Sequence, residues 1–183
     1  MLYIDLPTRS DLDVLLAHRG APAVSIYLAT TPLTQEAQAD RIELKNLARA
    51  AVAEMEAGGT PKRQVQAIEG AIEAVIADDD FWAVQANSLA LFVTPERIRT
   101  FRLPNRLQSL AEVSDRFHLK PLIRAVTFPQ NAWVLAIGMG GVRLVEVTAD
   151  LPAHEVKVPD LPKDMASGPA PGGRARRRAS MRC

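Results

Sequence analysis

The sequence predicts an α/β (α+β) fold in which an N-terminal mixed sheet packs against a long helical pair. Two segments, 34–58 and 60–76, carry apolar residues at helical spacing, and from Asn87 onward the spacing becomes that of strands. With 183 residues, 48% of them hydrophobic, the chain can fill the core of one domain and part of a second. A wholly disordered protein is therefore excluded.

The helices are predicted from their capping residues. Thr8 and Asp11 have the spacing of a capping box that opens a short helix. Thr34 is the expected N-cap of the long helix, which ends at Gly58-Gly59, and Thr60 followed by Pro61 is expected to start the next one. The two long helices are expected to form an antiparallel pair on the sheet.

The strands are predicted from β-branched and aromatic runs bounded by turn residues. A buried strand is expected at 24–28, and a brief helix from Pro121 through Ala125. Gly138-Met139-Gly140-Gly141 lacks the spacing of a nucleotide-binding loop and predicts a hairpin turn. The remaining strands are expected at Ser88–Thr94, Ile98–Leu103, Leu110–Val113, Trp133–Ile137, Val142–Val147 and, as an edge, Val156–Val158.

Composition limits the function further. The single cysteine, Cys183, leaves no disulfide framework or thiolate metal site, and no apolar run approaches the roughly 20 residues of a membrane-spanning helix. We therefore expect a cytoplasmic protein without a cofactor. Residues 161–183 hold six basic residues and one acidic, a net charge of +5, among Pro, Gly, Ala and Ser. Residues 163–183 are expected to be a disordered basic tail, either a nucleic-acid arm or the product of a shifted reading frame.

Candidate catalytic and metal sites are weak. Asp78-Asp79-Asp80 could hold a divalent cation, but adjacent carboxylates diverge, and a solvated turn is the favoured interpretation. The histidines are not spaced for zinc. Asp115 and His118 could orient Ser114 or Ser88, but no nucleophile elbow frames either serine. No catalytic or metal-binding residue is predicted.

Two groups of basic residues are candidates for RNA binding. The first group lies at i, i+4 and i+8 of the long helix and either contacts phosphates or covers the edge of the core. The second lies within 97–124, where seven basic and two acidic residues give a net charge of +5 around Phe101 and Phe117. Strand alternation places Arg99 and Arg102 on opposite faces of the sheet. The candidate contacts are Arg41, Lys45, Arg49, Arg99, Arg102, Arg116 and Lys120.

Several long segments resemble the bacterial archaeo-eukaryotic release factor families, and most of all the group called family three. The resemblance covers nearly all of residues 1–164, and it rests on TTPLTQEAQADRIELKNLAR at 30–49, FWAVQANSLALFVTP at 81–95, FRLPNRLQ at 101–108, VSDRFHLKPLIRAVTFPQ at 113–130 and VRLVEV followed by KVPDLPKD. It implies an N-terminal α/β domain at 1–128 and, at 129–162, the initial strands of an incomplete RNase-H-like middle domain, truncated or frameshifted after about residue 164.

The functional residues of release factors do not carry over. A Gly-Gly-Gln loop is absent, since Gly173 is followed by Arg174 and Gly141 by Val142, and no Asn-Ile-Lys-Ser string occurs. The resemblance implies an uncharacterised factor of translation that is associated with the ribosome or RNA and is non-catalytic in this segment. The alternatives are a hydrolase of RNA or phosphoesters whose active site lies in the missing middle domain, and a protein-interaction domain. Oligomeric state stays open.

Overall fold

The computed structural model describes residues 3–32, 37–127, 131–138, 141–148 and 151–159. The chain divides into two compact units, residues 1–130 and 131–183, and each is described by itself. The expected N-cap at Thr34, the turn at 139–140 and the tail at 163–183 lie outside the described residues.

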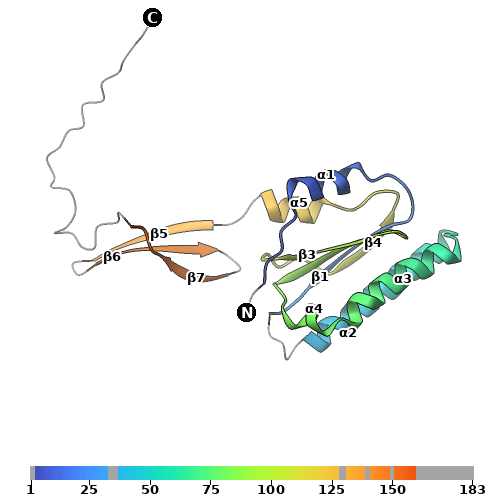
Figure 1. The fold of residues 1–183 in the computed structure, drawn as a ribbon, viewed down its shortest axis with the longest axis horizontal. Helices are drawn as coiled ribbons and strands as arrows, with labels where there is room; N and C mark the ends of the chain where they lie inside the picture. The colour runs from blue at the N-terminus through green and yellow to red at the C-terminus, as the bar shows by residue number, and fades with distance from the viewer. Residues whose placement is uncertain (1–2, 33–36, 128–130, 139–140, 149–150, 160–183) are drawn as a thin grey trace, which may run out of the picture. The chain divides into compact units, whose positions relative to one another are not determined.

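The first unit is built on a four-stranded sheet in the order β3-β2-β1-β4 (Figure 1). Its strands are β1 (Ala23–Ala29), β2 (Ser88–Val93), β3 (Ile98–Leu103) and β4 (Leu110–Ser114). Every pairing is antiparallel, so the prediction of a mixed sheet was wrong. The reason is that a pair of long helices, followed by one short helix, connects β1 to β2. A helix pair returns the chain to the end at which it left, and Ala29 accordingly pairs with Ser88.

The predicted helical pair is confirmed and covers one face of this sheet (Figure 1). Helix α2 (Ala37–Ala57) and helix α3 (Lys62–Ala77) bury an apolar stripe against the strands. Leu44, Met55, Ile68 and Ile72 are at most 1% exposed and pack with inward residues of β1 and β2. Burying each such side chain contributes roughly 1.5–3 kcal/mol.

Two shorter helices, α1 (Arg9–Ala17) and α5 (Lys120–Thr127), cover the other face (Figure 1). Leu15 and Leu122 pack there against Tyr27, Phe92 and other residues of the sheet. The Tyr27 hydroxyl donates a hydrogen bond of 2.6 Å to the carbonyl of His118. Because both faces are covered, β1 is almost continuously buried and does not alternate.

The ends of the helices confirm one predicted cap and correct another. Asp11 N donates to Thr8 Oγ1 and Thr8 N donates to Asp11 Oδ2, which is the expected capping box. Helix α3, however, begins at Lys62 with Pro61 as its N-cap. Thr60 is engaged in ending α2, since its N–H donates to the Met55 carbonyl across Gly59, whose φ is +74°. The prediction of Thr60 as N-cap was therefore wrong.

A further short helix, α4 (Asp79–Ala83), follows α3 and was missed by the sequence analysis. Asp78 caps it by accepting a hydrogen bond from Phe81 N at 2.9 Å. Asp79 and Asp80 lie in its first turn, where their negative charges stabilise the helix by interacting with its dipole. Among the residues described by the structure, no three acidic, histidine or cysteine side chains form a metal-binding group.

The second unit is a three-stranded antiparallel sheet, β5 (Asn131–Gly138), β6 (Gly141–Thr148) and β7 (Leu151–Val156), in that order. The predicted hairpin is confirmed, whereas the edge strand lies earlier in the chain than 156–158. None of the side chains described in this unit is buried, and Trp133 and Ile137 are 57% and 63% exposed. Its relation to an RNase-H-like domain stays a prediction.

Candidate nucleic-acid interface

The three predicted basic residues of α2 differ in their surroundings. Lys45 and Arg49 are exposed, and neither forms an ion pair with a residue that the structure describes. Arg41 is occupied, because its Nη2 lies 2.7 Å from Asp79 Oδ1 and its guanidinium lies 5.7 Å from the centre of the Trp82 ring. The sequence could not show this pairing, since Asp79 follows 38 residues later. Two of the three residues therefore remain free to bind a phosphate.

Arg102 lies on the face of the sheet that α2 and α3 cover, and it is only 8% exposed. Its guanidinium lies 4.1 Å from the Phe81 ring centre and 5.1 Å from that of Tyr3, and Nη2 donates to the Phe81 carbonyl at 3.1 Å. Burial lowers the pKa of Arg102. A buried guanidinium that contacts two rings cannot reach a phosphate outside, so Arg102 is better placed to hold the fold together than to bind RNA.

Arg99 lies on the opposite face, as strand alternation predicted. It forms an ion pair with Asp11 and so links β3 to α1. The hydrogen bonds from Thr8 and the charge of Arg99 lower the pKa of Asp11. Arg116 is exposed, and its Nε lies 3.6 Å from Asp115, a solvated pair that contributes little.

Lys120 forms part of a larger cationic site. A hollow of about 780 Å³ lies between α5 and the loop that joins β3 to β4. We call it the basic hollow. Three of its lining side chains are cationic and none is acidic; the lining residues are Asn105, Arg106, Leu107, Gln108, Lys120, Pro121, Arg124 and Ala125.

Local structure explains why these cations meet. Lys120 and Arg124 are four residues apart and therefore project from one face of α5. Arg106 lies in the loop between β3 and β4, and residues at the start of β2 hold this loop in place. There, Asn87 Nδ2 donates to the Pro104 carbonyl at 2.7 Å, and Leu107 N donates to Ser88 Oγ at 2.8 Å. Arg106 and Arg124 belong to the basic cluster at 97–124 but are not among the predicted RNA contacts, because residue spacing does not show the path of the loop.

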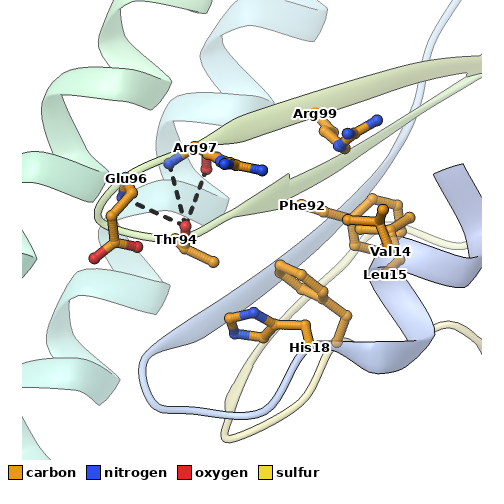
Figure 2. A pocket seen from close by; sticks show the side chains of 9 residues that line it. Val14, Leu15, His18, Phe92, Thr94, Glu96, Arg97 and Arg99 are labelled. Carbon is orange, nitrogen blue, oxygen red and sulfur yellow. Dashed lines mark hydrogen bonds between the residues drawn. The ribbon is translucent and has the colours of Figure 1, made fainter.

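A second, smaller cavity of about 290 Å³ lies between α1 and the β2–β3 turn (Figure 2). We call it the α1 pocket. It combines apolar, aromatic and charged side chains from three separate segments of the chain, which is why no sequence motif revealed it. The residues that line it are Val14, Leu15, His18, Phe92, Thr94, Glu96, Arg97, Arg99 and Phe117.

The candidate serine site is not assembled in the residues that the structure places. Ser114 Oγ donates to Asp115 at 3.3 Å, and His118 Nδ1 lies 2.8 Å from Glu112 Oε2, so the imidazole faces a carboxylate and not the serine. Ser88 Oγ accepts the hydrogen bond from Leu107. In the described part of the chain, no helix is long and apolar enough to cross a membrane.

The fold and these cavities define the first unit as an α/β domain with cationic surface sites. The model of bacterial archaeo-eukaryotic release factor family 11 matches residues 129–180. Two solved structures are similar in fold. One, an archaeal protein, is 16% identical with a TM-score of 0.46, over 86% of this chain and 47% of its own. The other, the archaeal translation termination factor aRF1, is 18% identical with a TM-score of 0.45, over 81% and 43%.

The family match supports the resemblance to the release-factor-like families over residues 129–180. It corrects the group, because the matching model is that of family 11 and not of family three. The matched segment also includes residues 163–180, which weighs against a shifted reading frame there. The chain spans less than half the length of either structure named above. No curated protein matches it.

Proposed function

We propose that this chain is the N-terminal part of a cytoplasmic, release-factor-like factor of translation that associates with RNA, including ribosomal RNA, and is non-catalytic in this segment. The observation that carries the proposal is the basic hollow, where Arg106, Lys120 and Arg124 converge without a lining carboxylate. The family match supports the connection to translation.

The hollow suits a phosphate backbone better than a small ligand. It is open, five of its eight lining residues are polar or charged, and its cations come from a helix face and a loop. Such a surface gives binding with little sequence preference that weakens as salt rises. Three phosphate contacts on a single strand give a slope of log affinity against log salt of about −2, so affinity falls roughly 20-fold between 50 and 200 mM salt.

The test measures binding of a labelled single-stranded RNA and sedimentation with ribosomes at both salt concentrations. The variant Arg106→Glu, Lys120→Glu, Arg124→Glu is compared with Lys62→Glu, Arg63→Glu, which changes two exposed cations at the start of α3. We expect the first variant to lose binding and the control to retain it. Wild-type binding that ignores salt, or an equal loss in both variants, would refute the proposal.

A further inference from the structure

The α1 pocket has an apolar interior backed by the sheet. Phe92 and Leu15 are 1% and 3% exposed and form its floor, and Val14 of α1 lies beside them. A volume of about 290 Å³ lies at the lower end of the range for small-molecule sites, which favours a ligand with one compact ring system.

Two aromatic side chains form one wall of the pocket. The His18 and Phe117 rings have their centres 4.8 Å apart and are inclined by 32°. Phe117 in turn meets Phe92 edge to face, with centres 5.4 Å apart, so its ring is braced from behind. His18 Nε2 lies 3.1 Å from the Gly20 carbonyl, to which it donates a hydrogen bond.

The opposite side of the pocket carries two guanidinium groups, those of Arg97 and Arg99, as Figure 2 shows. Asp11 neutralises and holds Arg99, whereas Arg97 is exposed and its side chain pairs with no described carboxylate. The turn that carries Arg97 is fixed, because Thr94 Oγ1 accepts hydrogen bonds from Glu96 N and Arg97 N at 3.4 and 3.2 Å. The cation thus stands on an ordered turn beside an aromatic wall.

We infer that the α1 pocket binds a nucleotide, with its base against the His18–Phe117 wall and its phosphate at Arg97. A planar π system and an anion a few bonds apart match an aromatic wall facing a guanidinium. Glu96, which also lines the pocket, supplies acceptors for N–H groups on the edge of the base. The inference rests on the proposed function for the class of ligand, and the nucleotide is either free or one residue of an RNA strand.

The experiment uses the whole 183-residue chain and follows the His18 and Phe117 ring resonances by NMR. The four nucleoside monophosphates, the matching nucleosides, inorganic phosphate and a short acidic peptide with one aromatic residue are added separately. The same titrations are made on Phe117→Leu, on Arg97→Ala and on the control Arg63→Ala, with thermal melting to show that each variant is folded. Binding of the labelled RNA is measured in parallel.

We expect at least one monophosphate to shift both rings. Phe117→Leu should weaken its binding about 5- to 150-fold, the range for loss of one stacked base. Arg97→Ala should weaken the monophosphate and leave the nucleoside unchanged, and Arg63→Ala should change neither. The parallel RNA assay separates a free nucleotide, which leaves RNA affinity intact in Phe117→Leu, from a residue of a strand, which lowers it.

Other outcomes would overturn the inference. These are no ring shift with any monophosphate at millimolar concentration, equal shifts with phosphate alone, or shifts with the acidic peptide only. Failure of the proposed function is distinguishable, because it appears as loss of salt-dependent RNA binding through the basic hollow whether or not monophosphates shift His18 and Phe117.

Discussion

Replacing Arg102 distinguishes a structural arginine from an RNA contact. Arg102 is among the RNA contacts predicted from the sequence, whereas in the structure it is buried against Phe81 and Tyr3. Arg102→Ala removes two cation–π contacts and one charge-assisted hydrogen bond to the Phe81 carbonyl. That carbonyl keeps the hydrogen bond from Gln85 Nε2 at 2.7 Å, so truncation leaves no orphaned acceptor there.

The expected cost of Arg102→Ala is about 2–4 kcal/mol, from lost contacts and an unfilled space. For a unit of this size it corresponds to a melting temperature about 5–15 °C lower. Arg102→Met should cost less than about 1.5 kcal/mol, because it fills the space and removes the buried Nε, which has no hydrogen-bond partner among the described groups. Arg102→Lys should resemble the alanine variant more than the methionine one, because an ammonium cannot stack between two rings.

The assays are thermal melting by circular dichroism and RNA binding as a function of salt. All three Arg102 variants should bind RNA with wild-type affinity and wild-type salt slope at a temperature where they are folded. If Arg102→Met kept the wild-type melting temperature but made the salt slope shallower by about 0.7, Arg102 would be a phosphate contact and the structural reasoning would be refuted.

Three further predictions concern stability. Asp11→Ala removes the capping box of α1 and should cost about 1 kcal/mol in urea unfolding at pH 7. Hydrogen bonds from Thr8 lower the pKa of Asp11 below 3.8, so this contribution to stability is present above pH 4 and fades as the pH falls through the folded-state pKa. Equal costs of the substitution at pH 7 and pH 2 would contradict this origin. Tyr27→Phe should cost about 1 kcal/mol at pH 7 through the lost hydrogen bond to His118. Burial raises the pKa of Tyr27, so the wild type should lose stability as the pH rises above 10, and a phenylalanine variant with the same alkaline loss would refute this origin. Gly59→Ala should cost about 1 kcal/mol because φ is +74°, whereas Gly70→Ala within α3, where an added Cβ meets no atom within 4 Å, should be neutral or stabilising by up to about 1 kcal/mol in the same melts.

The fold was largely predictable because its main signals are local. The apolar stripes of α2 and α3, the capping box at Thr8 and the turn between β2 and β3 each depend on residues within a few positions. The errors have physical causes of longer range. The backbone of Thr60 ends α2 and therefore does not cap α3, and the strand directions follow from the helical pair that returns the chain from β1 to β2.

The candidate site was less predictable because charge totals do not specify partners. Three arginines that lie in basic clusters along the sequence each bind a partner that is distant in sequence. Arg41 pairs with Asp79, Arg99 pairs with Asp11, and Arg102 donates to the Phe81 carbonyl. Conversely, Arg106 and Arg124 gain their significance from a loop path held by Asn87 and Ser88. A residue's accessibility is decided by tertiary contacts, which residue spacing does not encode.

The sheet also separates the two predicted basic clusters. Lys45 and Arg49 project from α2, whereas Lys120 projects from α5, and these helices cover opposite faces (Figure 1). Since a covered sheet with a helical layer on each side lies between them, the clusters do not merge into one flat binding surface. The basic hollow and the α1 pocket, by contrast, both lie in the layer of α1 and α5. Contacts to a single RNA strand are therefore best sought on that face, and any contribution from Lys45 and Arg49 belongs to a separate interaction.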